Sequence, residues 1–489
     1  MLRPLPLALT ERISPAGGTP LYMQIIGAIV RDIERGRLKP GTYLPSSREL
    51  AAELGVSRKT VVIAYDELIA QGWLVSAGTR GTLVSTRFSD PVAAVEQPTM
   101  AVRLPENPLY RFVPAPERPL AVPDGSGLKL DEGAPDVRLF PTDTLAKAYR
   151  HAIRDMAGTP ALAYRDPLGL AALRTNIAEM LGAQRGLNVS ADRICITRGS
   201  QNAIFLVAQV LTRPGDTVLF ESLTYEPAVA AFRTLGARTL AVPLDRDGID
   251  VAAVEQACRQ HPVRALFLTP HHQFPTTVAL QPERRLRLLS LARQFGFAIV
   301  EDDYDHEFHF ASQPLLPMSA YAPDHVIYIG SLSKLLLPAL RIGYIAAPAA
   351  VTAALAHAVA LTDGMGNALT EAAVDLLIRE GELHRHARRA RSIYAGRRGA
   401  FAALLGDRLG DDVQFDLPDG GLAFWLRFPE RDMDRMEARM TAMGLRFAAS
   451  TSYMLGRDAP RGLRVGFASL AADEADAAVG QLRAALDSH

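Results

Sequence analysis

Apolar residues recur at helical spacing in three successive segments near the start of the chain. The first segment is 20–33, the second lies within 44–55, where a serine caps it and a glycine ends it, and the third is 58–72. Serine favours the start of a helix and glycine favours its end, so the pattern predicts three helices. A short glycine-containing turn separates the second helix from the third, which is typical of a helix-turn-helix.

Two short apolar runs follow the third helix. Residues 73–76 and 81–85 have the composition of strands, and the turn between them ends in Arg80. Such a hairpin forms a wing, with Arg80 at its tip for a minor groove or a phosphate. We therefore expect residues 1–86 to form a winged helix-turn-helix DNA-binding domain.

The pattern changes after this domain. Residues 87–124 contain eight prolines and few periodic apolar residues, which is typical of a semi-extended linker, long enough to let the first domain reach a neighbouring subunit. From Leu145 onward, helices alternate with short apolar strands, which predicts an α/β sheet within residues 125–489. The expected strands include 217–220, 264–269, 298–302, 326–330 and 341–346.

The last part of the chain has a different pattern again. After Gly364 it has basic helices, including one over 379–398, and then strands such as 421–426. These elements predict a smaller C-terminal α+β lobe that begins at about residue 365. The arginines of the 379–398 helix are more typical of a solvated face than of a DNA surface.

Charge and cysteine content narrow the class of protein. The 53 basic and 53 acidic residues cancel, so any nucleic-acid site is local; residues 1–86 carry ten Lys and Arg against seven Asp and Glu. Cys195 and Cys258 lie in apolar runs, which excludes a disulfide framework and indicates a reducing compartment, hence a cytoplasmic protein. Prolines interrupt the apolar start of the chain, and the longest apolar helix candidate, 346–361, is too short to span a bilayer.

The first turn of the third helix is basic. Arg58 and Lys59 oppose the helix dipole there, at a cost of about 0.3 to 1 kcal/mol each, and DNA phosphates would offset this cost. Arg48 could instead pair with Glu53 within its own helix. The alternative for the whole segment is a small helical cap that binds no ligand. The predicted contacts with double-stranded promoter DNA are Ser47, Arg48, Ser57, Arg58, Lys59, Thr60, Tyr65 and Arg80.

A lysine among hydroxyl groups follows the buried strand predicted over 326–330. Ser331 and Ser333 precede Lys334, and Arg341 follows it seven residues later. Lysine is normally a solvated charge, so one in this position needs a counter-ion or a covalent partner. Pyridoxal 5'-phosphate supplies both, because its aldehyde condenses with the amine and its phosphate accepts hydrogen bonds from the serines and the arginine. The alternative is a loop lysine with chance serines nearby.

Two other segments suit the same cofactor. The run 298–302 ends in carboxylates, and Asp302 is the candidate for the anion that keeps a pyridine nitrogen protonated, with Tyr304 near the ring oxygen. The alternative is a solvated acidic turn. Within 194–203, a strand and a glycine turn lead into an apolar helix whose first amides suit a phosphate. The residues of that turn are Gly199, Ser200 and Gln201.

The order of these segments resembles the fold-type I aminotransferases over about residues 125–489, and Tyr164–Gly169 resembles the Tyr-x-Asp-Pro-x-Gly element of that family. The resemblance implies a large α/β sheet domain with a small C-terminal α+β lobe. It also implies that Lys334 forms the Schiff base and that Asp302 faces the pyridinium nitrogen. The further roles it implies are ring stacking for Tyr225, phosphate binding for Ser331, Ser333 and Arg341, and a carboxylate clamp for Arg464.

The N-terminal segment resembles the winged helix of GntR-type regulators, above all in Leu44–Ala51 and around Trp73. With an aminotransferase-like domain behind it, the chain is identified as a member of the MocR subfamily, in which the pyridoxal phosphate domain senses a ligand. Aminotransferases usually carry an Asn-Pro-x-Gly turn, and this chain has Phe274 in place of the asparagine. A phenyl ring cannot donate the asparagine's hydrogen bond. Thr277 stands where glycine is usual in both groups.

The resemblance implies a homodimeric transcription regulator in which an amino-bearing effector replaces Lys334 by Schiff-base exchange, with its acid group held by Arg464. An active aminotransferase with a DNA-binding domain is the alternative, and a DNA-binding protein with a vestigial cofactor fold is a third. We expect no metal site. Adjacent histidines such as His271 and His272 point to opposite faces of a strand, and no Cys/His spacing resembles a zinc site.

Overall fold

The computed structural model describes residues 13, 18–87, 111, 128–310, 315–456 and 459–487. The chain divides into two compact units, Met1–Ala115 and Pro116–His489, and each unit is treated by itself below. Apart from residues 87 and 111, the linker predicted over 87–124 lies outside the described residues.

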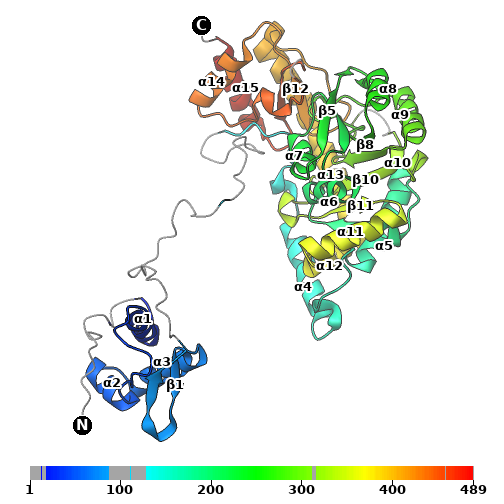
Figure 1. Ribbon diagram of the computed structural model, residues 1–489. Coiled ribbons are helices and arrows are strands. Elements are labelled where there is room, and N and C mark those ends of the chain that lie inside the picture. Colours follow the sequence, from blue (N-terminus) through cyan, green and yellow to red (C-terminus); the bar gives the residue numbers. More distant parts are fainter. Residues whose placement is uncertain are drawn as a thin grey trace. The chain divides into compact units, whose positions relative to one another are not determined.

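The first unit is a winged helix-turn-helix, as the sequence predicts. Its elements are α1 (Leu21–Glu34), α2 (Ser47–Leu54), α3 (Arg58–Ala70), β1 (Leu74–Ser76) and β2 (Thr82–Val84), and the two strands pair antiparallel as the wing (Figure 1).

Local sequence sets the ends of the recognition helices. Ser46 and Glu49 form a capping box at the start of α2, in which Glu49 Oε2 accepts from the Ser46 amide at 2.8 Å. Gly55 ends α2 in the left-handed region, and the Ser57 side chain caps α3. The core beneath them is formed by buried side chains that include Ile25, Ala28, Ile29, Leu50, Val61, Ala64, Leu68, Leu74 and Val84.

A seven-stranded sheet is the centre of the second unit. Its strand order is β3-β11-β10-β9-β8-β4-β5, with all neighbours parallel except β11, which is antiparallel to both β10 and β3. The bounds are β3 (Ile194–Thr197), β4 (Thr217–Glu221), β5 (Arg238–Val242), β8 (Val263–Leu268), β9 (Ala298–Asp303), β10 (Val326–Ser331) and β11 (Gly343–Ala346).

Helices cover both faces of this sheet, which gives three layers (Figure 1). One face packs against α6 (Ser200–Leu211), α7 (Glu226–Thr234) and α11 (Ala349–Thr362). The other packs against α8 (Val251–Gln260), α9 (Pro282–Phe295), α10 (Met318–Tyr321) and α5 (Ala171–Arg185). A short hairpin, β6 (Leu244–Asp245) and β7 (Gly248–Ile249), lies between β5 and α8 in the sequence.

The C-terminal elements are α13 (Glu382–Leu409), β12 (Ala423–Leu426), α14 (Met433–Ala442), β13 (Leu463–Gly466) and α15 (Ala472–Asp487). Strands β12 and β13 pair antiparallel, and α15 packs on α13 and α14. Among the described residues, no helix has both the length and the apolar character needed to cross a membrane.

Residues with positive φ change the bounds of two predicted elements. The helix expected over 379–398 is divided, because Gly381 takes a φ of +69° between α12 (Ala368–Arg379) and α13. The preceding helix α12 packs on α5 and on α4 (Thr142–Met156). The strand expected over 341–346 begins only at Gly343, since Arg341 has a φ of +52°.

Candidate functional site

The predicted cofactor residues lie at one edge of the seven-stranded sheet. Strands β3, β4, β9 and β10 are parallel, so their carboxyl ends share this edge. The antiparallel strand β11 starts there, where Gly343 pairs with both Ser331 and Thr197. The fold thus gathers the loops after β3, β4, β9 and β10, which contain Gly199, Tyr225, Tyr304 and Lys334, beside Asp302.

Lys334 is the one half-buried lysine of the five in the chain; the other four, Lys39, Lys59, Lys129 and Lys147, are exposed. Its Nζ donates to the Gly133 carbonyl oxygen at 2.6 Å. Burial lowers the pKa of Lys334, against the opposing charges of Asp131, Asp305 and Glu132. A lowered pKa favours the neutral amine, and the neutral amine is the nucleophile that attacks an aldehyde.

Asp302 is a buried carboxylate that needs a cationic partner. It is 5% exposed, and its Oδ1 has no hydrogen-bond partner within the described ranges. Burial, followed by the charges of Asp303 and Asp305, raises the pKa of Asp302 to about 8. A buried anion in this position is stabilised by a protonated ring nitrogen, which is the partner the sequence predicts for it.

Aromatic rings line the same edge. Phe274 stands edge-on to Tyr225 with ring centroids 5.2 Å apart, and to Tyr304 at 6.3 Å. The Tyr304 hydroxyl donates to the His272 carbonyl oxygen at 2.8 Å. Phe274 thus places a ring, not a hydrogen-bond donor, between Tyr225 and Tyr304.

A second group of residues forms a cradle for an anion. Gly199 has a φ of +80°, and a Cβ added there would lie 3.1 Å from the Arg341 guanidinium carbon. Ser331 Oγ accepts from the Ser333 amide at 3.1 Å, while the buried Ser333 Oγ lacks a partner in the described part of the chain. No side chain caps the start of α6 beside them, so its first amides face the cradle.

Ser200 and Gln201 form the first turn of α6. The Gln201 side chain donates to the Pro227 carbonyl oxygen at 3.0 Å, so its Nε2 is engaged away from the phosphate role. An amine, a buried carboxylate opposite it and an anion cradle are the three parts that a phosphorylated pyridine aldehyde requires. The residues present therefore fit pyridoxal 5'-phosphate.

Arg464, the predicted carboxylate clamp, is 3% exposed and makes contacts that the sequence did not predict. Its Nη1 donates to the Pro275 carbonyl oxygen at 2.7 Å, its Nε to the Glu132 carbonyl oxygen at 2.9 Å, and its Nη2 to the Tyr304 hydroxyl at 3.2 Å. The guanidinium also lies 4.7 Å from the centre of the Phe274 ring. These three hydrogen bonds leave two of the five guanidinium N–H donors for an incoming carboxylate, which could also replace one of the acceptors.

The segment Asp131–Gly133 is a part of the site that sequence reasoning missed. Its backbone oxygens accept from Lys334 and Arg464, and burial raises the pKa of Glu132 against the charges of these two cations. The acidic pair followed by glycine was the available signal in the sequence. It lies about 200 residues from Lys334 and 332 from Arg464, so its role needed the fold.

In the first unit, most predicted DNA contacts lie on the surface. Arg48, Arg58, Lys59 and Arg80 are exposed. Ser57 caps the start of α3, and its hydroxyl oxygen lies 2.8 Å from that of Thr60. Ser47 Oγ accepts from Arg58 Nε at 3.4 Å.

Tyr65 is the exception. Its ring is 5% exposed, and its hydroxyl donates to the Pro45 carbonyl oxygen at 2.9 Å. The side chain therefore joins α3 to the segment before α2. Our prediction that Tyr65 contacts DNA is wrong, because its side chain is buried. The apolar spacing of α3 places it on the core side with Val61 and Leu68.

The structure also brings together a cluster of histidines and carboxylates in a place where the sequence led us to expect no metal site. His271 and His272 point apart, as expected, toward Asp303 and Asp305 respectively. His306, from another loop, joins His271 at Asp303. Adjacency in the sequence was the wrong feature to test, because these residues come together from different loops.

Comparison with known proteins finds both domains. Residues 127–482 match the family "Aminotransferase class I and II", and residues 21–84 match "Bacterial regulatory proteins, gntR family". The chain is 31% identical over 92% of its length to the probable rhizopine catabolism regulatory protein MocR of Rhizobium meliloti, covering 90% of that protein. It is 32% identical to the pyridoxine biosynthesis transcriptional regulator PdxR of Corynebacterium glutamicum, over 96% of each chain.

A solved structure similar to the second unit is LysN, an α-aminoadipate aminotransferase from Thermus thermophilus complexed with N-(5'-phosphopyridoxyl)-L-leucine. It has a TM-score of 0.68 and 30% identity, and the match covers 73% of this chain and 92% of that one.

Proposed function

Because this chain belongs to the MocR-type GntR regulators, with a GntR helix-turn-helix domain ahead of an aminotransferase class I and II domain, we propose that it regulates transcription by sensing an amino-bearing effector at Lys334. Its cofactor is pyridoxal 5'-phosphate. When bound, this cofactor supplies an aldehyde that condenses reversibly with primary amines.

The proposal divides the chain into residues 1–86 for DNA, a linker over 87–124, and residues 125–489 for the cofactor and effector. In the first part, Arg48, Arg58, Lys59 and Arg80 supply exposed cations on α2, on α3 and at the wing. Such cations bind the phosphates of promoter DNA, and the start of α3 enters the major groove.

One observation carries the proposal. Of five lysines, only Lys334 is withdrawn from solvent, and burial lowers its pKa where an exposed lysine would keep a proton. Its neighbours at the sheet edge are Asp302, which can hold a proton at a ring nitrogen, and Arg341, which can hold a phosphate. An effector amine would replace the Lys334 amine as the partner of the aldehyde.

Arg464 provides the second anchor and a way to transmit the change. The carboxylate of an amino-acid effector would compete with the Pro275 and Glu132 carbonyl oxygens for the guanidinium. Arg464 lies on β13, whereas Pro275 follows β8, so the exchange alters contacts between the C-terminal lobe and the sheet domain. An effector that binds one arrangement better shifts the population toward it, and DNA affinity follows.

An active aminotransferase is the second candidate function. The same Lys334, Asp302 and Tyr225 would serve an enzyme, and Lys334 would then move a proton on and off the substrate. Phe274 favours the sensor function over the enzyme. Its aromatic ring occupies the place where a hydrogen-bond donor would tune the cofactor.

A spectroscopic titration separates the two. The purified protein with its cofactor is mixed with a panel of amines and amino acids, and absorbance and promoter binding are followed together. The sensor predicts a spectral change that reverses when the amine is removed and that tracks DNA affinity. Full conversion to the pyridoxamine form, with turnover on a keto acid, would show the enzyme instead.

The proposal also includes a homodimer. Helix-turn-helix proteins commonly bind DNA as dimers that read two half-sites, and a linker of the proposed length would let two reading heads reach such sites. Light scattering of the cofactor-loaded protein tests this part on its own.

A further inference from the structure

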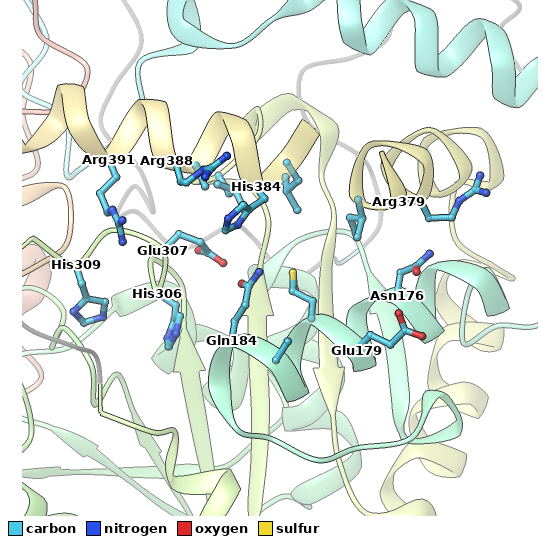
Figure 2. Close-up of a pocket in the computed structure, with 16 residues that line it drawn as sticks. Asn176, Glu179, Gln184, His306, Glu307, His309, Arg379, His384, Arg388 and Arg391 are labelled. Carbon is cyan, nitrogen blue, oxygen red and sulfur yellow. The ribbon is translucent and has the colours of Figure 1, made fainter. Parts of the chain in front are cut away.

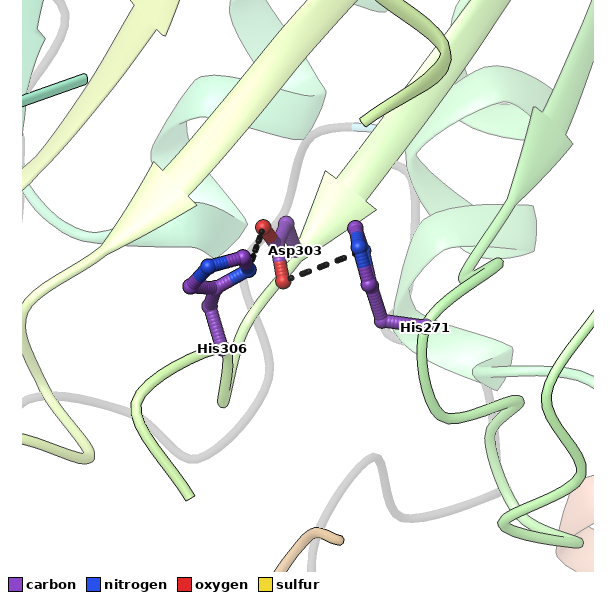
Figure 3. A group of neighbouring side chains, drawn as sticks. All are labelled: His271, Asp303 and His306. Carbon is purple, nitrogen blue, oxygen red and sulfur yellow. Dashed lines mark ion pairs between the residues drawn. The ribbon is translucent and has the colours of Figure 1, made fainter. Parts of the chain in front are cut away.

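Three buried side chains from two loops meet at the carboxyl ends of β8 and β9. His271 follows β8, Asp303 is the last residue of β9, and His306 follows three residues later. They are 4%, 2% and 6% exposed. Their ligand atoms lie within 4.8 Å of one another, and Figure 3 shows the two imidazoles on either side of the Asp303 carboxylate.

His271 has one ring nitrogen engaged and one left over. Its Nε2 lies 2.6 Å from the Leu315 carbonyl oxygen, so Nε2 carries the proton and donates. Because Nε2 holds the ring proton of the neutral imidazole, Nδ1 presents a lone pair. That lone pair faces Asp303 Oδ1 at 3.6 Å, and neither atom has a hydrogen-bond partner among the described residues. Two buried lone pairs that face each other repel unless a cation lies between them.

The second histidine, His306, also has a ring nitrogen without a hydrogen-bond partner among the described residues. His306 Nδ1 lies 3.0 Å from Asp303 Oδ2, yet it makes no hydrogen bond of acceptable geometry to any residue the structure describes. Arg185 does not occupy this carboxylate, because its Nη2 donates to Glu307 at 2.6 Å while its Nη1 stays 3.8 Å from Asp303 Oδ2. Asp303 therefore faces an imidazole nitrogen through each of its two oxygens.

We propose that His271 Nδ1, the Asp303 carboxylate and His306 Nδ1 bind a first-row divalent transition-metal ion, with Zn²⁺ the best match. Two imidazoles and one carboxylate are ligands that zinc takes at about 2.0 to 2.2 Å, which puts the ligand atoms of a tetrahedral site about 3.4 Å apart. His271 Nδ1 lies 3.6 Å from Asp303 Oδ1 and His306 Nδ1 lies 3.0 Å from Asp303 Oδ2, and one ligand atom from each residue lies within 4.8 Å of the others. The side chains would have to draw together around the ion to reach the tetrahedral spacing. Magnesium and calcium are poor matches, because both prefer oxygen ligands.

The surroundings supply the outer contacts that metal ligands usually have. The bond from His271 Nε2 to the Leu315 carbonyl oxygen fixes the ring and its tautomer. The Tyr328 hydroxyl donates to Asp303 Oδ2 at 2.5 Å, which orients the carboxylate. Three protein ligands leave a fourth position for water.

An ion can reach this site from solvent. A cavity of about 830 Å³ is lined by His306, Glu307 and His309 along one side and by residues of α5, α12 and α13 along the others (Figure 2). His306 therefore forms both a ligand and part of the cavity wall. The cavity provides an entry path for the ion.

The metal would join two segments that carry cofactor residues. Asp302 directly precedes Asp303 on β9, and side chains of adjacent strand residues point to opposite faces. Phe274 lies three residues after His271 in the loop that follows β8. A bound ion would tie that loop to the end of β9 from the side away from the cofactor and hold both residues in place.

The test is zinc binding to tag-free, full-length protein with its cofactor, after removal of metal with a chelator. Wild type should retain one Zn²⁺ per chain after dialysis, and zinc should raise its melting temperature. His271→Gln and His306→Gln should each weaken zinc affinity about 100-fold or more, since loss of an outer contact alone costs 10- to 100-fold. His151→Gln, a change at an exposed histidine paired with Asp155, is the matched control and should bind zinc like wild type.

Cobalt keeps the proposal testable if a variant folds poorly. Wild type loaded with Co²⁺ should show the intense visible bands of four- or five-coordinate cobalt with nitrogen ligands. Failure of wild type to retain zinc, retention that survives either substitution at His271 or His306, or the weak bands of six-coordinate cobalt would each overturn the proposal.

Discussion

The site requires glycine at position 199 for two reasons. Its φ of +80° is a conformation that disfavours other residues, and a Cβ there would lie 3.1 Å from the Arg341 guanidinium carbon. We predict that Gly199→Ala lowers the affinity for pyridoxal phosphate by at least about tenfold, because the strain alone costs about 1 to 2 kcal/mol and Arg341 must move. Cofactor titration followed by absorbance measures this.

Gly182 provides the control for that change. It lies within α5, and a Cβ there would meet nothing within 4 Å. Gly182→Ala should leave cofactor affinity unchanged and slightly raise the melting temperature, since alanine favours a helix over glycine by about 1 kcal/mol. If the two substitutions changed the affinity for pyridoxal phosphate equally, the claim that Gly199 forms part of the anion cradle would be contradicted.

His386 predicts a pH dependence of stability. The ring is 5% exposed and stacks edge-on against Phe140 at 5.1 Å. Burial, then the charge of Arg389, lowers its pKa to about 4 from the model-compound value of 6.5. Between about pH 6.5 and pH 4, His386 is therefore protonated in the unfolded chain but neutral in the folded chain. The free energy of unfolding falls as the pH drops toward 4. At pH 5 the loss from this one group is about 2 kcal/mol.

Thermal melting of wild type and His386→Phe at pH 7 and pH 5 measures this contribution. The variant keeps an aromatic ring against Phe140 but cannot take up a proton, so it should lose less stability on acidification. An identical loss in both proteins would mean that the proton on His386 does not matter.

Sequence reasoning located individual residues better than their partners. Lys334 and Asp302 lie at the predicted edge, because local motifs at strand ends specify such positions. The contacts of Arg464 with the backbone of Glu132 and Pro275 were missed, since these partners lie 332 and 189 residues away. Tyr65 was wrongly predicted to contact DNA. The recognition helix that contains it was predicted correctly, but Tyr65 lies on the face of that helix that packs on the core.

At the scale of elements, the capping box of α2 predicts a local effect. Ser46 Oγ accepts from the Glu49 amide at 3.3 Å, and the Ser46 amide donates to Glu49 Oε2 at 2.8 Å. Ser46→Ala should destabilise the start of α2 by about 1 kcal/mol. Hydrogen exchange of the first α2 amides should then be about fivefold faster, while exchange in α13 stays as in wild type.

The elements that were missed share a physical reason. The edge strand β5 was not predicted, since its apolar run is only three residues long and Val242 alone is buried. The antiparallel direction of β11 depends on the close pairing of Gly343 with Ser331 and Thr197, which no local pattern reveals. The break at Gly381 was hidden by arginines that continue on both sides of it.

At the scale of the whole molecule, the charge of the first unit predicts salt-dependent DNA binding. Replacing both Arg58 and Lys59 with alanine should weaken binding to promoter DNA and reduce the slope of log affinity against log salt by about 0.9 for each lost phosphate contact. Lys39→Ala is the control, because Lys39 is equally exposed but lies outside α2, α3 and the wing. Unchanged affinity in the double variant would remove α3 from the interface.

Whole-molecule features were also the least accessible to sequence reasoning. Two recognisable domains followed from motifs, because each motif is local. The meeting of His271, Asp303 and His306 requires two loops after different strands to come together, and only the strand order β9-β8 brings them there.

The central claim is that the buried amine of Lys334 and an effector amine share one partner. Borohydride reduction of the cofactor-loaded protein, followed by mass spectrometry of its peptides, tests this most directly, because the other four lysines are exposed and serve as internal controls. We predict a phosphopyridoxyl group on Lys334 that disappears in step with the change in promoter affinity as effector is added. Labelling of any other lysine in its place, or labelling of Lys334 that persists while promoter affinity changes, would contradict the account.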